Sequence, residues 1–186
     1  MGYTDNDANI ASLFKKGDHE NPENYRPISL LNVTYKLMAY IIHNRICYNL
    51  DPHLGNLQSG FRKGRSTVDP IYCVRRLQDI VEQGNDRLIM ILLDWEKTFD
   101  KIDQQKMFQA LERLNIPKPI IDMIKAMYDN PRFRVQQTDQ ASQWKVQRTG
   151  IRQGCPLSPF LFILTMHVMF TDIKKRLKDP WGKKRS

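Results

Sequence analysis

The segment Leu88–Leu93 constrains the fold most strongly, because it is a continuous apolar run with a charged residue at each end. Runs of this length are typical of a strand that is buried on both faces of a sheet. Asp94 follows the run directly, so we expect its carboxylate at the edge of that sheet. A carboxylate in this position can hold a metal ion, but an Asp after an apolar run can equally end a strand or cap a helix.

Helical spacing of apolar residues predicts helices in several other segments. Asn32 can cap the start of a first helix, and Asp51-Pro52 can end it. Gly84 can end a second helix in the left-handed conformation. The expected helices are Val33–Leu50, about 67–84, Gln104–Leu114, Pro117–Tyr128 and about Leu157–Leu177. The residues expected to face the core are Val33, Leu37, Met38, Ile41, Ile42, Ile46 and Leu50 in the first helix, and Ile71, Val74, Leu77 and Val81 in the second.

Strand signals are fewer than helix signals. Phe133 and Val135, then Trp144 and Val146, alternate with polar residues on either side of residues 138–142, which predicts a β-hairpin. Because helices and strands interleave without a strict βαβ repeat, the sequence favours an α+β fold over a doubly wound sheet. The polar residues 1–11 are expected to form a loose leader, and residues 178–186 a basic tail.

Lys and Arg outnumber Asp and Glu by 29 to 20, which gives a net charge of +9 and a pI near 9.5. This balance favours a polyanionic partner such as nucleic acid, although ribosomal and structural proteins share it. Three widely spaced cysteines without a Cys-x-x-Cys pair argue against a disulfide framework or a zinc ribbon, and favour an intracellular setting. No secretory signal is expected, because the chain does not open with a charged region, an apolar core and a small-residue cleavage site. No membrane partner is expected, because the most apolar stretch, Pro156–Phe170, is too short for a membrane span.

A series of motifs occurs in order along nearly the whole chain. The motifs lie at Leu13–Asp18, Asn24–Leu31, Gln58–Thr67, Leu93–Asp100 and Gly150–Pro159. Together they closely resemble the successive motifs of non-LTR (LINE-type) retrotransposon reverse transcriptases, and group II intron enzymes have a similar Gly-Phe-Arg-x-Gly-Arg-Ser element. The resemblance implies a fingers lobe over residues 12–85 and a partial palm over residues 86–177. It also implies an RNA-directed DNA polymerase that uses an RNA template, a DNA primer, deoxynucleoside triphosphates and Mg²⁺.

The resemblance assigns roles to residues of the expected palm. Asp94 matches the first metal-binding, catalytic aspartate, with the backbone carbonyl of Trp95 as a further ligand, and Mg²⁺ prefers such hard oxygens. Phe99 matches the bulky residue beneath the incoming sugar, where a ring excludes a 2′-hydroxyl; ordinary core packing is the alternative. Gln153 and Gly154 match residues beside the nucleotide and the primer end, although they can also simply form a turn before a helix.

The resemblance also assigns roles to basic residues. Arg26 matches the fingers arginine that contacts the triphosphate, and Lys15 or Lys16 matches the lysine near its terminal phosphate. Two further basic sets suit contact with template or primer phosphates, unless they are only solvated charge. They are Arg62, Lys63 and Arg65 in a Gly-rich loop, and Arg132, Arg134, Lys145 and Arg148 on the expected hairpin.

The sequence departs from the family pattern after Pro156. The family's palm has a Tyr-Ala-Asp-Asp type hairpin downstream, since two metal ions need ligands from more than one strand. Here only Asp172 and Asp179 are acidic after Pro156, and no Asp-Asp pair occurs in the chain. Two expectations stay open: a polymerase fragment that ends before this hairpin and the thumb, or a catalytically inactive basic RNA-binding remnant. Copying into a genome would imply the nucleus in a eukaryote.

Overall fold

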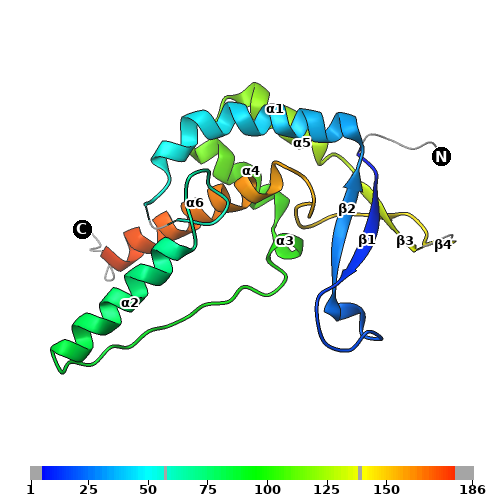
Figure 1. The fold of residues 1–186 in the computed structure, drawn as a ribbon. Helices are drawn as coiled ribbons and strands as arrows, with labels where there is room; N and C mark the ends of the chain where they lie inside the picture. Colours follow the sequence, from blue (N-terminus) through cyan, green and yellow to red (C-terminus); the bar gives the residue numbers. More distant parts are fainter. Residues whose placement is uncertain (1–5, 57, 138–139, 179–186) are drawn as a thin grey trace, which may run out of the picture.

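The computed structural model describes residues 6–56, 58–137 and 140–178 (Figure 1). Helices and strands are interleaved, which confirms the α+β fold class. The strands are β1 (Ala8–Phe14), β2 (Tyr25–Leu31), β3 (Arg132–Gln137), β4 (Gln140–Ala141) and β5 (Lys145–Val146). The helices are α1 (Val33–Leu50), α2 (Val68–Gln83), α3 (Thr98–Lys101), α4 (Gln104–Arg113), α5 (Lys118–Met127) and α6 (Ser158–Lys178), with short 3-10 helices at Pro22–Asn24 and Asp51–His53.

Strand β1 lies in the middle of the sheet. It pairs antiparallel with β2, where Ala8 is opposite Leu31, and parallel with β3, where Ala8 is opposite Phe133. The expectation of a loose leader over residues 1–11 is therefore wrong for residues 8–11, while residues 1–5 lie outside the described part of the chain. Asp7 is fully buried and pairs with Arg132 at 2.6 Å. The sequence did not reveal this order, because Asp7 pairs with a residue that is 125 positions away.

The predicted hairpin is confirmed. β3 and β5 pair antiparallel, with Arg132 opposite Val146, and β3 also pairs with the short β4. Residues 138–139 of the expected connection lie outside the described residues. The sheet combines strands from both sides of the expected boundary at residues 85 and 86, and the limits of the two lobes stay predictions.

Helices α1, α4, α5 and α6 enclose the main hydrophobic core, in agreement with the predicted helices. Asn32 caps α1 as predicted, because its side-chain oxygen accepts a hydrogen bond from the Thr34 amide at 3.0 Å. The N-terminal half of α6 is largely buried. Core side chains with almost no exposed surface are Ile42, Met107, Leu111, Ile124, Phe160, Leu161 and Leu164. None of the described helices is both long and apolar enough to cross a membrane.

The buried face of α1 differs in part from the predicted face. It consists of Tyr35, Ala39, Ile42 and Ile46. Ile42 and Ile46 were expected inside, but Val33, also expected there, is 79% exposed. Apolar residues surround this helix on most sides, so its periodicity fits more than one stripe, and the tertiary packing decides which stripe is buried.

The segment Leu88–Leu93 is the largest departure from prediction. It forms no strand, and Ile89 and Leu92 are 88% and 85% exposed. A buried strand needs paired strands at its edges and packed layers on its faces, and the described part of the chain supplies neither. Figure 1 shows this segment as a long connection that runs from the far end of α2 back to α3.

Helix α2 is also uncovered. It contains no buried residue, so the expected inward face, which included Ile71 and Leu77, is wrong. The helix extends away from the core in Figure 1 and has no described layer to pack on. It ends at Gly84 as predicted, but the left-handed residue is Asn85, with a φ of +52°, whereas Gly84 has a φ of −82°.

Candidate active site

A cavity of about 840 Å³ brings together residues that are far apart in the sequence. It lies between the strands β1 and β2 and the segment 94–100, and the loop 150–157 contributes to its lining. The predicted site residues that line it are Lys15, Arg26, Asp94, Trp95, Phe99 and Gln153. Of the other predicted site residues, Lys16, Arg62, Lys63, Arg65 and Gly154 do not line it.

Strands β1 and β2 position two of the cations of this cavity, Lys15 and Arg26. Arg26 lies on β2 opposite Leu13 of β1, and Lys15 follows the end of β1, where its amide donates to the Asn24 carbonyl at 2.8 Å. Gly17 closes the turn with a φ of +96°. Lys15 and Arg26 are exposed, and neither has an ion-pair partner within the described ranges. Both side chains are therefore available to an anionic ligand.

On the opposite side of the cavity, a tight turn connects Asp94 and Trp95 to α3. Lys97 adopts a left-handed backbone with a φ of +49°, and the Thr98 hydroxyl donates to the Trp95 carbonyl at 2.8 Å. The Lys97 ammonium pairs with Glu23 at 3.0 Å, and this hydrogen bond raises the pKa of Lys97. The exposed pair connects the two sides of the cavity but adds little stability by itself.

Phe99 is held between two other aromatic rings. Its ring centroid is 6.1 Å from that of Phe61, with a T-shaped geometry, and 5.5 Å from that of Phe162 on α6. Phe99 packs against the hydrophobic core and also lines the cavity. Core packing and a place beside a ligand are therefore compatible at this residue.

The loop 150–157, which precedes α6, forms backbone hydrogen bonds to both β2 and α3. The Ser29 amide donates to the Gln153 carbonyl at 2.7 Å, and the Ile151 amide donates to the Phe99 carbonyl at 2.7 Å. Gly154 has a φ of +104°, and a Cβ atom there would lie 2.8 Å from the Ser29 carbonyl oxygen. A glycine at position 154 therefore allows the loop to approach β2 closely, and it does not line the cavity.

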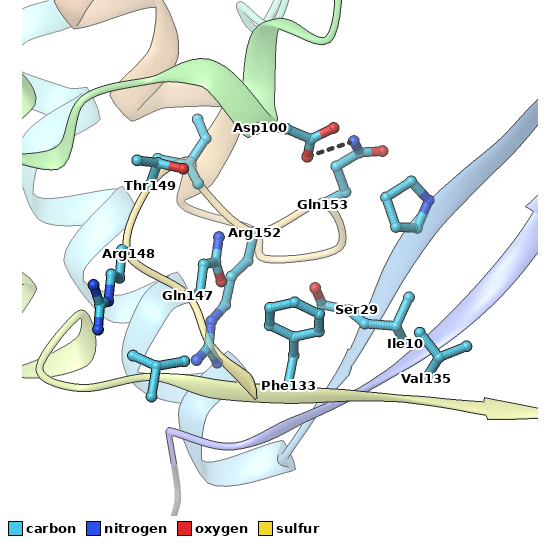
Figure 2. A pocket seen from close by; sticks show the side chains of 13 residues that line it. Ile10, Ser29, Asp100, Phe133, Val135, Gln147, Arg148, Thr149, Arg152 and Gln153 are labelled. Atoms are coloured by element: carbon cyan, nitrogen blue, oxygen red, sulfur yellow. Dashed lines mark hydrogen bonds between the residues drawn. The ribbon is translucent and has the colours of Figure 1, made fainter. Parts of the chain in front are cut away.

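A second cavity, of about 470 Å³, lies beyond Asp100 and Gln153 (Figure 2). These two residues line both cavities, and the Gln153 amide donates to the Asp100 carboxylate at 3.4 Å. Arg152 lines the second cavity, is 1% exposed and donates to the Asn6 carbonyl. Its guanidinium lies 5.0 Å from the centre of the Tyr35 ring, and burial raises the pKa of that tyrosine.

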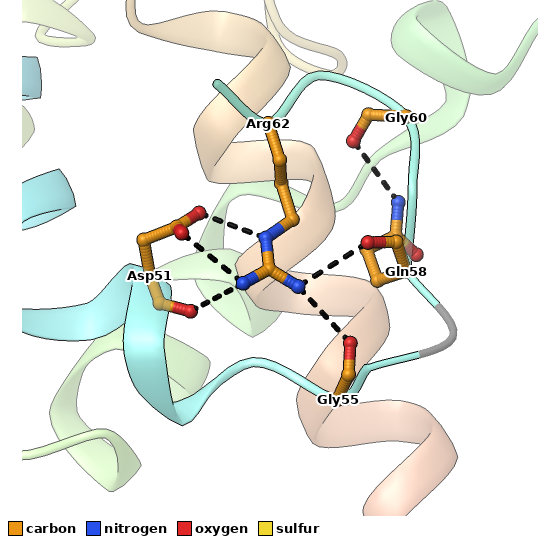
Figure 3. A network of polar contacts seen from close by, with 5 residues as sticks. All are labelled: Asp51, Gly55, Gln58, Gly60 and Arg62. Carbon is orange, nitrogen blue, oxygen red and sulfur yellow. Dashed lines mark hydrogen bonds and ion pairs between the residues drawn. The ribbon is translucent and has the colours of Figure 1, made fainter. Parts of the chain in front are cut away.

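Arg62 has a structural role that the sequence did not predict (Figure 3). Its side chain is 3% exposed, and its Nε and Nη2 atoms donate to the Asp51 carboxylate at 2.8 and 3.1 Å. Further hydrogen bonds reach the carbonyls of Asp51, Gly55 and Gln58 at 2.7, 3.1 and 3.2 Å. A guanidinium has five N–H donors, and all of them are engaged here. The predicted phosphate contact of Arg62 is therefore wrong in this arrangement, while Lys63 and Arg65 are exposed and stay predictions.

Two arginines of the predicted hairpin are also engaged within the protein. Arg132 pairs with the buried Asp7, and the Nε of Arg134 donates to the Asn9 side chain at 2.9 Å. Both guanidinium groups lie over the Trp144 ring, at 5.4 and 4.8 Å from its centre. The contact of this hairpin with nucleic acid stays a prediction, and the exposed Lys145 and Arg148 are the residues that best suit it.

Phe61 and Asp100 are among the residues of the first cavity to which the sequence assigned no role. Phe61 lines it, although the prediction used only the basic residues of the Gly-rich loop. Asp100 lines it too, although the motif that contains Asp100 suggested no role for this residue. No local signal in the sequence reveals either contact, because both depend on how loops meet across the fold.

Comparison with known proteins identifies the class to which this chain belongs. The family of reverse transcriptases (RNA-dependent DNA polymerases) matches residues 14–184, so the chain belongs to this family. Within it, the relatives are proteins of transposable elements, which confirms the predicted resemblance to non-LTR retrotransposon reverse transcriptases. The fold also resembles a solved structure, apo telomerase from Candida tropicalis truncated from its C-terminal domain, with a TM-score of 0.56 and 17% identity over 96% of this chain and 40% of that one.

The relatives are much longer than this chain. The transposon TX1 uncharacterized 149 kDa protein of Xenopus laevis is 31% identical over 91% of this chain, which corresponds to 13% of that protein. The probable RNA-directed DNA polymerase from transposon BS of Drosophila melanogaster is 31% identical over 83% of this chain and 17% of its own length. The chain therefore spans less than a fifth of either relative.

Proposed function

We propose that this chain supplies the nucleotide-binding side and the first catalytic carboxylate of an RNA-directed DNA polymerase site. The convergence of Lys15, Arg26, Asp94, Phe99 and Gln153 on one cavity carries the proposal. A mobile ammonium and a planar guanidinium suit the phosphates of a deoxynucleoside triphosphate. Of the two candidate lysines, Lys15 is favoured, because Lys16 does not line the cavity.

We propose that Asp94 and Trp95 hold Mg²⁺ through a carboxylate and a backbone carbonyl, the hard oxygen donors that this ion takes. The Trp95 carbonyl already accepts the Thr98 hydroxyl, which fixes its direction and leaves its second lone pair for another partner. When bound, Mg²⁺ would neutralise charge that develops on the transferred phosphoryl group. Within the described ranges, no group of three or more His, Cys, Asp or Glu residues can hold a metal ion. A second carboxylate source, in the remainder of the palm, would therefore complete the site.

Phe99 would exclude ribonucleotides. Its ring lines the cavity and is fixed from behind by Phe162, so a 2′-hydroxyl at this position would meet a rigid apolar surface. Gln153 offers a side-chain donor and an acceptor at the border of the second cavity. The net charge of +9 and the exposed Lys63, Arg65 and Arg148 support binding of an RNA template and a DNA primer.

The alternative is a basic RNA-binding remnant without catalytic activity. The lack of a three-residue metal cluster among the described residues favours it for this chain alone. Transfer of a phosphoryl group depends mainly on positioning and electrostatic stabilisation. Asp94 is the one aspartate of the cavity proposed to bind metal, and by itself it would leave most of that stabilisation unsupplied.

Primer extension on an RNA template with Mg²⁺ and deoxynucleotides distinguishes the two functions. We expect no extension by this chain and extension by a version that also carries a family-like Asp-Asp hairpin and the remaining palm strands. Asp94→Ala in the extended version should lower the rate by about 10³-fold or more, whereas the exposed Asp122→Ala should leave it unchanged.

Extension by this chain alone, abolished by Asp94→Ala, would contradict the need for a second carboxylate source. An extended version that binds RNA in a salt-dependent manner but extends no primer would favour the RNA-binding alternative.

A further inference from the structure

Phe61 has a backbone conformation that phenylalanine rarely adopts. Its φ is +58°, in the left-handed region, and its side chain is 58% exposed. A bulky residue in this region is an outlier, and such outliers gather at functional sites, where the surrounding structure enforces them. Phe61 lines the cavity that also contains Asp94 and Phe99. The conformation therefore places an exposed aromatic ring at a candidate active site.

The hydrogen bonds on both sides of Phe61 hold this conformation. On one side, all donors of Arg62 are engaged by Asp51, Gly55 and Gln58 (Figure 3). On the other side, the Gln58 side-chain amide donates to the Gly60 carbonyl at 3.2 Å. The network ties the loop to the end of α1, so polar contacts of the neighbouring residues, and not burial of the ring, hold the backbone around Phe61.

The ring of Phe61 meets the ring of Phe99. The two centroids are 6.1 Å apart with an interplanar angle of 87°, an edge-to-face contact. Phe162 supports Phe99 from another side, with an interplanar angle of 32°. Phe99 is therefore confined between a ring from the core helix α6 and a ring from the loop of residues 58–65. Removal of the Phe61 ring would leave Phe99 free to move toward the loop.

We propose that Phe61 is a positioning residue for sugar selection: it holds Phe99 in the place where a 2′-hydroxyl would sit. Arg62 supports this role by fixing the loop. The inference rests on the proposed function, because it assumes that the cavity binds a nucleoside triphosphate and that Phe99 faces the sugar. According to this inference, a residue from outside the expected palm contributes to the selection of deoxynucleotides over ribonucleotides.

The test is binding of dATP and of ATP to this chain in Mg²⁺, measured by isothermal titration calorimetry. Phe61→Asn removes the ring but keeps the backbone, because Asn tolerates the left-handed region. We expect its preference for dATP over ATP to fall roughly two- to tenfold, the range that one aromatic pair contributes. Phe61→Tyr keeps the ring and should keep the preference, as should Phe170→Ala, which removes an exposed ring that does not line the cavity.

The outcomes separate this inference from the proposed function. An unchanged preference in Phe61→Asn, with wild-type affinity for dATP, would overturn the role of Phe61 and leave the proposed function intact. A wild-type chain that binds neither nucleotide would overturn both. Thermal unfolding of each variant checks the fold, and Phe61→Asn should unfold at or above the wild-type temperature, because it relieves backbone strain.

Discussion

At the scale of single residues, two glycines share a left-handed backbone but differ in their surroundings. Gly64 has a φ of +72°, and a Cβ atom there would have no neighbour within 4 Å. Gly154 has a φ of +104°, and its Cβ would lie 2.8 Å from the Ser29 carbonyl oxygen. Backbone conformation alone therefore explains the glycine at 64, whereas Gly154 is also required by the contact between the loop and β2.

Gly154→Ala should lower the free energy of unfolding by about 3 kcal/mol, since a left-handed alanine is strained and its methyl group overlaps a backbone atom. Gly64→Ala is the matched control, and the backbone strain alone should cost about 1–2 kcal/mol. Urea denaturation of both variants measures the difference. Equal losses would mean that the loop and β2 do not approach as closely as described.

At the scale of elements, the segment Leu88–Leu93 and helix α2 present apolar residues to solvent. Ile89, Ile91 and Leu92 are 88%, 78% and 85% exposed. An unpaired apolar segment is a site for edge-to-edge association with another chain. The sequence predicted this segment as a buried strand. Its continuous apolar run therefore suits a strand that pairs with a neighbouring strand.

Replacement of Ile89 and Leu92 by Lys should reduce self-association without loss of stability. Because both side chains are exposed, we expect the free energy of unfolding to change by less than about 0.5 kcal/mol. Light scattering over a range of protein concentrations measures association, and urea denaturation measures stability. Leu161→Lys, at a fully buried position of α6, is the control and should prevent folding. If the double variant failed to fold, as the Leu161→Lys control is expected to, the segment would be buried in solution.

At the scale of the whole molecule, residues near the start of the described chain hold distant parts together. Asp7 pairs with Arg132 of β3, and the Asn6 side chain donates to the Ala126 carbonyl at 2.9 Å. Arg152 of the loop 150–157 donates to the Asn6 carbonyl. The sheet, α5 and the loop before α6 therefore meet at these two residues, which composition alone marked as a loose leader.

Asp7→Asn should lower the free energy of unfolding by about 3 kcal/mol, because it leaves the charge of Arg132 without its buried partner. Glu112→Gln breaks an exposed pair with Lys125 and serves as the control. The control should change stability by less than about 0.5 kcal/mol. If Asp7→Asn behaved like the control, the N-terminal segment would not anchor the sheet.

The sequence by itself determined the helices and the family. Periodicity and capping residues predicted α1, α4, α5 and α6 nearly to their ends, since hydrogen bonds within a helix join residues four apart and caps are adjacent. The ordered motifs also named six residues that line one cavity, including Asp94 and Arg26. These inferences depend on short-range patterns that a single sequence displays directly.

Only the tertiary structure decided which of those patterns are used. It chose the buried stripe of α1, left Leu88–Leu93 exposed, turned Arg62 inward to Asp51 and placed Phe61 against Phe99. Each of these outcomes depends on a partner that is distant in the sequence or, for the exposed segment, on the lack of one among the described residues. Burial and pairing are properties of two surfaces, and one segment of sequence describes only one of them.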